Sequence, residues 1–153
     1  MKRIIFICLF SLFWSSVAIS EPKTIDCPTM IRIHLAGVYK RSIHRLMDAQ
    51  IYVESRGNPF AISPFGDYGI LQIRQIKLDD YYQKTGIRYT LQDCFNPEVS
   101  KEVYLYYANR IGTTPDKWET IARAWAGGLS RAKHECTLDY WQKVNKQLNK
   151  VNV

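Results

Sequence analysis

The chain has 153 residues, of which 46% are hydrophobic and 23% charged, and its 21 basic against 14 acidic side chains give a formal net charge of +7. This composition excludes a mostly disordered chain, and the eight glycines and six prolines exclude fibrous and low-complexity classes. The length fits one domain built around a single core.

The first twenty residues have the pattern of a secretory signal peptide. Lys2 and Arg3 precede an apolar run over residues 4–19, and small residues lead to Glu21, the expected new N-terminus. The alternative, an uncleaved membrane anchor, needs a longer apolar stretch. We therefore expect an exported protein, periplasmic or secreted, with no stable membrane span after cleavage.

Without residues 1–20, which carry two of the basic side chains, 133 residues and a net charge of +5 remain. The basic residues are spread along the chain rather than clustered. This distribution favours a general attraction to an anionic wall or surface polysaccharide over sequence-specific nucleic-acid binding, so no nucleic-acid partner is expected.

Export allows a disulfide bond. The cysteines that remain after cleavage are Cys27, Cys94 and Cys136. One thiol would therefore stay free, and the sequence does not choose the pair. The three histidines, at positions 34, 44 and 134, are not at ligand spacing, so we expect neither a metal site nor a cofactor.

A helix is predicted from about residue 38 to 54, because Ile43, Leu46, Met47 and Ile51 recur at spacings of three and four. Gly57 and Pro59 would end this helix. Residues 60–73 combine turn formers with short apolar pieces, which predicts a small irregular β-hairpin.

Further helices follow. Asn96-Pro97-Glu98 reads as an N-cap, a first-turn proline and a first-turn acid, and Thr114-Pro115-Asp116 repeats this device. Gly127-Gly128 would end the second of these helices, and a last helix with a lysine-rich outer face is expected from about 138 to 148. The predicted fold class is mainly α, of the α+β kind, with the hairpin beside the first helix.

Glu54 differs from the other acidic residues by its position. It follows Ile51 by three residues, Met47 by seven and Ile43 by eleven, so it lies on the apolar stripe of the predicted helix. Burial there would raise the pKa of its carboxyl group and let it donate a proton as a general acid. The alternative is a glutamate at a frayed helix end that reaches solvent.

The segment after this helix resembles the signature of the lytic transglycosylase family with the lysozyme-like fold. The matching elements are Glu54-Ser55, Asn58-Pro59, Ser63-Pro64 and the run from Gly69 to Ile73. Two later segments, 94–98 and 124–128, correspond to further family motifs, so the resemblance covers about residues 36–130. It implies a single lysozyme-like domain within residues 21–153.

Two departures from the family pattern stand out. Trp125 replaces a tyrosine and Ala126 replaces an asparagine, so a polar contact near the catalytic glutamate is missing or comes from elsewhere. The second segment also lacks its asparagine at or near Lys101, which affects the structural match more than the chemistry.

The resemblance implies cleavage of the β-1,4 bond between N-acetylmuramic acid (MurNAc) and N-acetylglucosamine (GlcNAc) in peptidoglycan. Glu54 would protonate the bridging oxygen and then, as a carboxylate, take the proton of the muramic C6 hydroxyl as that oxygen closes on C1. The product is a 1,6-anhydro sugar, and no water is consumed. The raised pKa expected for Glu54 suits both steps.

Several other residues are predicted to belong to the site. Asp67 is a possible second carboxylate that would direct a water as in a hydrolytic lysozyme, although Gly66-Asp67 also suits a simple turn. By resemblance Gln72 lines the cleft, with Leu71 and Ile73 turned to the core by strand alternation. The other candidates for substrate binding are Ser55, beside the acid and suited to orient it, and the aromatic residues Tyr68 and Trp125.

The leading hypothesis is thus an exported enzyme that cuts peptidoglycan strands. Family habits place such small enzymes beside a secretion or conjugation apparatus. The alternatives are a hydrolytic lysozyme using Glu54 and Asp67, a catalytically silent glycan-binding protein on the same fold, and a disulfide-braced helical interaction protein.

Overall fold

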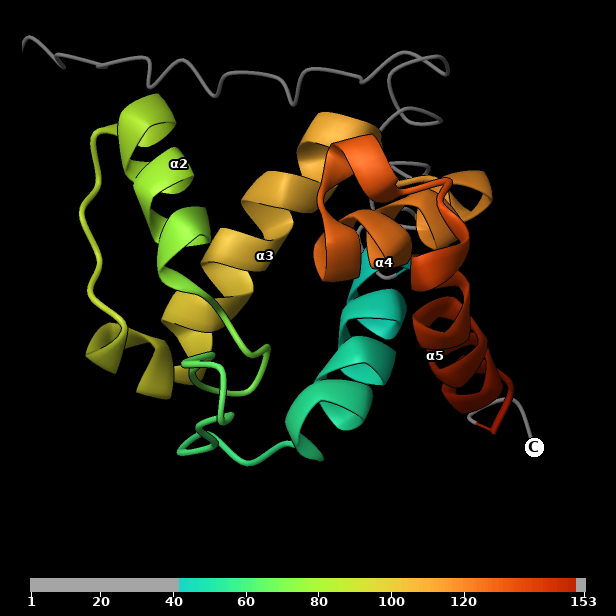
Figure 1. Cartoon of the computed structure of the whole chain (residues 1–153), viewed down its shortest axis with the longest axis horizontal. Coiled ribbons are helices and arrows are strands. Elements are labelled where there is room, and N and C mark those ends of the chain that lie inside the picture. The colour runs from blue at the N-terminus through green and yellow to red at the C-terminus, as the bar shows by residue number, and fades with distance from the viewer. Residues whose placement is uncertain (1–41, 151–153) are drawn as a thin grey trace, which may run out of the picture.

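The computed structural model describes residues 42–150, and within this range the chain is mainly helical (Figure 1). The first helix occupies residues 42–55. The remaining α-helices are α2 (Gln75–Thr85), α3 (Pro97–Ile111), α4 (Trp118–Gly127) and α5 (Leu138–Lys150). Short 3-10 helices lie between them, namely η1 (Gln92–Phe95), η2 (Pro115–Lys117), η3 (Leu129–Arg131) and η4 (Glu135–Thr137).

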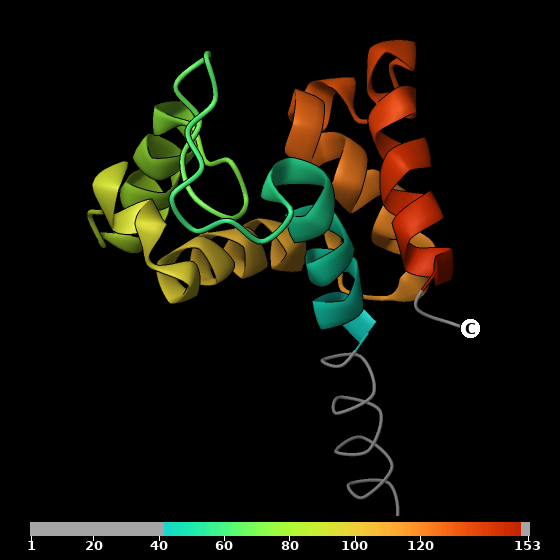
Figure 2. The same ribbon diagram turned by 90° about the horizontal axis from the view of Figure 1, so that it is seen from below.

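The helices form two sides joined by α3 (Figures 1 and 2). On one side lie α2 and η1, and on the other lie the first helix, α4 and α5. The core runs through both sides, and its fully buried side chains include Leu46, Leu71, Leu78, Val103 and Val144. Because these residues come from four helices and the loop after the first helix, burial of apolar surface fixes the two sides against each other.

The predicted helix starts at Asn96-Pro97-Glu98 and near residue 138 agree with the structure, whereas the predicted start near residue 38 lies outside the described residues. The side chain of Asn96 accepts a hydrogen bond from the backbone N–H of Glu98, and Pro97 is the first residue of α3. Thr114-Pro115-Asp116 instead opens η2, and α4 begins after it at Trp118. Gly128, with φ of 82°, ends α4 as expected.

The predicted β-hairpin is wrong in its detail. Within residues 42–150 no strand forms, and the segment carries only two isolated antiparallel bridges, Ile62 with Tyr68 and Tyr68 with Ile73. Left-handed backbone at Gly66, Gly69 and Gln72 interrupts any extended run. Residues 56–74 therefore form a loop of tight turns, which we call the cleft loop. Strand alternation does not apply to Gln72, although Leu71 and Ile73 are both fully buried.

Gly69 fixes the cleft loop against the start of α3. A Cβ atom at this position would lie 2.1 Å from the carbonyl oxygen of Cys94, and the glycine has φ of 77°. The hydroxyl of Ser100 donates a hydrogen bond of 2.8 Å to that same oxygen. Only glycine allows so close an approach of the two backbones.

Of the three cysteines in the predicted mature chain, Cys94 is buried and Cys136 is exposed, and both are free thiols. The two therefore do not pair with each other. Cys27 and the predicted signal peptide lie outside the described residues. Within the described part of the chain, no helix is long and apolar enough to cross a membrane.

Candidate active site

A cleft of about 770 Å³ lies between the two sides of the molecule. Its walls come from the end of the first helix, the cleft loop, α2, α3, α4, η3 and α5. The lining residues used below are Glu54, Asp67, Gln72, Lys77, Trp125 and Tyr140. The cleft thus gathers residues that are up to 86 positions apart in the sequence.

Glu54 lies in the last turn of the first helix and turns its carboxyl group into this cleft. Burial is the largest influence on this group and raises its pKa from 4.5 to about 7. The hydroxyl of Tyr140 donates a hydrogen bond of 2.7 Å to Oε1 and opposes that rise. A carboxyl group in this state is partly protonated near neutral pH, which agrees with the raised pKa expected from the apolar stripe.

The Glu54 carboxyl group ends a directional chain of hydrogen bonds. The hydroxyl of Tyr104 donates 2.6 Å to Oε1 of Gln50, and Nε2 of Gln50 donates 3.0 Å to the hydroxyl of Tyr140. Tyr140 then donates to Glu54. Gln50 and Tyr104 are completely buried, so each polar group in the chain depends on its neighbour for a partner.

Sequence reasoning missed all three of these supporting residues. The contribution of Gln50 could have been predicted, because it precedes Glu54 by four residues and so lies beside it on the same helix face. The contribution of Tyr140 could not have been predicted from sequence spacing, because it lies 86 residues further along the chain, on another helix.

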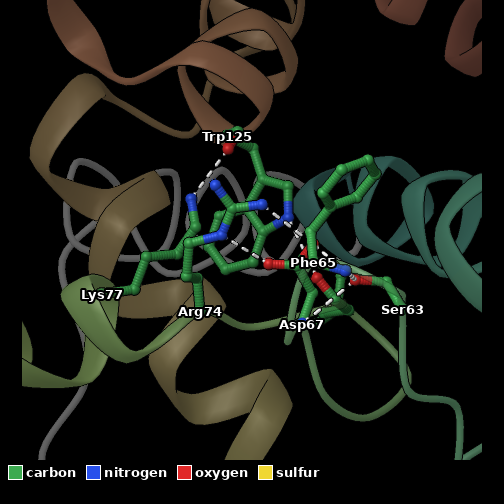
Figure 3. A network of polar contacts seen from close by, with 7 residues as sticks. Ser63, Phe65, Asp67, Arg74, Lys77 and Trp125 are labelled. Atoms are coloured by element: carbon green, nitrogen blue, oxygen red, sulfur yellow. Dashed lines mark hydrogen bonds and ion pairs between the residues drawn. The ribbon is translucent and has the colours of Figure 1, made fainter.

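Lys77 on α2 is a cation withdrawn into the cleft wall. Its Nζ donates a hydrogen bond of 2.7 Å to the carbonyl oxygen of Trp125 and lies 4.0 Å from the centre of the indole ring (Figure 3). Burial lowers the pKa of the Lys77 ammonium to about 8, while the charge of Glu54 opposes this shift. The sequence analysis did not single out this residue.

Asp67 also lines the cleft, but both of its carboxylate oxygens are engaged (Figure 3). Nε of Arg74 lies 2.6 Å from Oδ1, while a second guanidinium nitrogen of Arg74 and the hydroxyl of Ser63 contact Oδ2 at 3.0 and 2.9 Å. These hydrogen bonds with Arg74 are the main reason that the pKa of Asp67 lies below its usual value. The residue is thus an ionised member of a tight turn that also faces the cleft.

Gln72 lines the cleft, as expected, but its amide nitrogen is used within the cleft loop. Nε2 donates to the carbonyl oxygens of Gly69 and Ala61 at 2.9 and 3.2 Å. Its backbone is left-handed, with φ of 49°. These bonds hold the loop in shape and leave Oε1 as the atom suited to accept a hydrogen bond from a ligand.

Ser55 does not make the expected contact with Glu54 in the described part of the chain. Its hydroxyl donates a hydrogen bond of 2.9 Å to the carbonyl oxygen of Ile70, and it accepts one from the backbone N–H of Gly57. Ser55 therefore ties the end of the first helix to the cleft loop, which positions the acid through the backbone.

The two aromatic candidates differ in position. Tyr68 is not among the residues that line the cleft, and its ring packs 5.5 Å from that of Phe95. Trp125 lines the cleft but is only 5% exposed, and its Nε1 donates to the carbonyl oxygen of Leu71 at 3.2 Å. The methyl group of Ala126 lines the cleft beside it, so this position brings no polar side chain.

Within residues 42–150, no group of three histidine, cysteine, aspartate or glutamate side chains is arranged to hold a metal ion. The described residues offer to this cleft one proton-donating carboxyl group, an ammonium group and hydrogen-bonding side chains.

Comparison with known proteins identifies the family. The model of the transglycosylase SLT domain matches residues 36–148, which is most of the chain and includes every residue of the cleft. Searches of curated proteins and of solved structures gave no match. The chain therefore belongs to the transglycosylase SLT domain family, a membership that implies lytic transglycosylase activity on peptidoglycan in general.

Proposed function

We propose that the protein cleaves the MurNAc–GlcNAc β-1,4 bond of peptidoglycan without consuming water and leaves a 1,6-anhydro-MurNAc end. The single observation that carries this proposal is the state of Glu54, a cleft carboxyl group whose pKa of about 7 suits both donation and recovery of a proton.

The reaction balances on this one residue. Protonated Glu54 gives its proton to the bridging oxygen as the bond from C1 to that oxygen breaks, and GlcNAc leaves with a new hydroxyl group. The C6 hydroxyl oxygen of the same MurNAc then bonds to C1, and the Glu54 carboxylate takes the proton that this oxygen loses. The enzyme ends in its starting protonation state.

The surroundings of Asp67 support this route over hydrolysis. A base that activates water needs a free oxygen and a proton affinity suited to the task. Both oxygens of Asp67 are held by Arg74 and Ser63, and its pKa lies below the usual value. Asp67 is thus a poor base in this arrangement.

A hydrolytic lysozyme reaction is the second candidate, because Asp67 does face the same cleft and its negative charge reaches Glu54, whose pKa it helps to raise. A catalytically silent glycan-binding protein is the third. The absence of a polar side chain at Ala126 is the observation in its favour.

The product end group decides among the three. Purified peptidoglycan digested with the mature protein and analysed by mass spectrometry should yield 1,6-anhydro-MurNAc ends. Reducing MurNAc ends alone would favour the hydrolytic reaction, and strand binding without any cleavage would favour the silent binder. The variant Glu135→Gln, which changes an exposed residue outside the cleft, serves as the matched control for Glu54→Gln.

We further propose that the protein acts outside the cytoplasm, in the periplasm or as a secreted protein, and that it serves a secretion or conjugation apparatus. The signal-peptide pattern of residues 1–20 supports export. Fractionation of expressing cells followed by N-terminal sequencing tests this proposal. Glu21 at the N-terminus of an exported protein is expected, and an intact Met1 in the cytoplasmic fraction would contradict it.

A further inference from the structure

We propose that Lys77 is a positioning residue of the cleft, whose fixed ammonium group stabilises the charge of the Glu54 carboxylate through the shared cleft, between donation of its proton and recovery of it. This inference rests on the proposed function and adds a second charged group to it. Lys77 belongs to α2 and Glu54 to the first helix, so the pair spans the two sides of the molecule.

The ammonium group is held rigidly. One N–H of Lys77 is committed to the carbonyl oxygen of Trp125 at 2.7 Å, and the indole face lies 4.0 Å away on one side (Figure 3). The Tyr107 ring centre is 5.7 Å from the same nitrogen. A lysine held by a carbonyl oxygen and two aromatic rings cannot swing into solvent as a surface lysine does.

Two other cations of the cleft, one from the cleft loop and one from α3, are paired with carboxylates. Arg74 pairs with Asp67 at 2.6 Å and Arg110 pairs with Asp80 at 2.9 Å. Lys77 makes no ion pair within the described part of the chain. A partly buried ammonium without a paired anion is costly, and the cleft carboxyl group that lacks a cationic partner is Glu54.

The charged groups that face this part of the cleft come from several elements. They are Glu54 from the first helix, Asp67 and Arg74 from the cleft loop, Asp80 from α2, Arg110 from α3 and Arg131 from η3. The ionisable hydroxyls are those of Tyr107 and Tyr140. Burial raises the pKa of Glu54, whereas the hydrogen bond from Tyr140 and, next in size, the charge of Lys77 lower it.

The charge of Lys77 matters most in the step after Glu54 has donated its proton. Once Glu54 has given its proton to the bridging oxygen, a negative charge remains in a poorly hydrated cleft. Tyr140 offers one neutral hydrogen bond to that charge. The ammonium of Lys77 supplies the positive charge that keeps this carboxylate from recapturing the proton too early.

Three substitutions separate the charge of Lys77 from its hydrogen bond. Lys77→Gln keeps a donor for the Trp125 carbonyl oxygen and removes the charge, Lys77→Met removes both, and Lys77→Arg keeps the charge. Lys84→Met changes an exposed lysine of the same helix and is the matched control. Because two of the variants remove the charge and one keeps it, the set remains informative even if one member fails to fold.

The decisive measurement is an NMR titration of the Glu54 side-chain carboxyl carbon in the mature protein, with Glu54→Gln used to assign the signal. Lys77→Gln and Lys77→Met should raise the proton affinity of Glu54 about three- to tenfold, because a nearby positive charge is lost. Lys77→Arg and Lys84→Met should leave the titration midpoint unchanged. An unchanged midpoint in Lys77→Gln would overturn the proposal.

Kinetics on peptidoglycan give the second readout. Lys77→Gln should lower kcat about tenfold, leave KM nearly unchanged and move the alkaline limb of the pH profile upward. A loss confined to KM would show that Lys77 binds substrate instead and would also overturn the proposal. Because the NMR titration needs no activity, failure of the proposed reaction and failure of the Lys77 proposal remain distinguishable.

Discussion

Two of the carboxyl groups that line the cleft, Glu54 and Asp67, differ in their protonation. Glu54 lies on a helix among buried side chains and receives one hydrogen bond from a neutral tyrosine, so burial dominates and its pKa rises to about 7. Asp67 lies on a loop and accepts hydrogen bonds from a guanidinium group and a serine hydroxyl, so its pKa falls. The difference teaches that burial and the partners of a carboxyl group together decide whether it can carry a proton at neutral pH.

The sharpest test of this comparison removes each carboxyl group in turn. Glu54→Gln should lower kcat on peptidoglycan by about a thousandfold, because the proton donor is lost. Asp67→Asn should lower kcat by less than about tenfold, because this group holds a turn and transfers no proton. Turnover is measured by release of soluble muropeptides. Comparable losses in both variants would mean that the two carboxyl groups act together, as in a hydrolytic lysozyme.

Substitution of Gly69 in the cleft loop should lower the stability of the protein more than substitution of a glycine in an open turn. Gly69→Ala should reduce the free energy of unfolding by about 3 kcal/mol, because the new methyl group meets the Cys94 carbonyl oxygen. Gly86→Ala is the control. It has nearly the same φ, 75°, with open space around it, and should cost about 1 kcal/mol. Equal losses by urea denaturation would mean that the close approach is relieved by movement of the loop.

Ionisation of Glu54 should also destabilise the folded protein. The folded state holds the Glu54 proton up to a pKa of about 7, whereas the unfolded chain releases it near 4.5, so stability should fall as pH rises through that window. Glu54→Gln lacks this loss and should be more stable than the parent by about 3 kcal/mol at pH 8, with little difference at pH 4. Thermal unfolding of both proteins at the two pH values measures this, and a constant difference would contradict it.

The smallest effect expected concerns the neutral partner of Glu54. Tyr140→Phe removes the hydrogen bond that opposes the burial of this group, so the pKa of Glu54 should rise further and kcat should fall about tenfold. Tyr52→Phe, at an exposed position on the same helix as Glu54, is the control. The pH dependence of kcat measures the change, and an alkaline limb that stays in place would show that Tyr140 serves packing alone.

The helical part of the fold was largely predictable from the sequence. Periodicity located the first helix, and the Asn96-Pro97-Glu98 device gave the start of α3 to the residue. Helix α2 was missed, because only Leu78 and Tyr81 of its residues are buried and the apolar pattern is correspondingly weak. The cleft loop was mistaken for a hairpin because its apolar residues are held by turns, and composition does not distinguish turns from short strands.

The site was predictable only where it is local in sequence. Glu54 could be placed from the stripe on its own helix, and Asp67 and Gln72 follow within twenty residues. Their hydrogen-bond partners could not be assigned, since Gln72 turned out to bind its own loop and Ser55 to bind Ile70. Lys77 and Tyr140 reach the cleft only through tertiary packing, which no spacing in one sequence records.

The hydrogen-bond chain behind Glu54 also limits where its proton can go. Every link points toward the carboxyl group, and the far end is a tyrosine hydroxyl that is completely enclosed in the core. This path therefore has no outlet to bulk water, and Glu54 exchanges protons only through the mouth of the cleft. A glycan strand that fills the mouth of the cleft would close this route as well. The proton that Glu54 gives to the GlcNAc leaving group could then be replaced only by the proton of the MurNAc C6 hydroxyl.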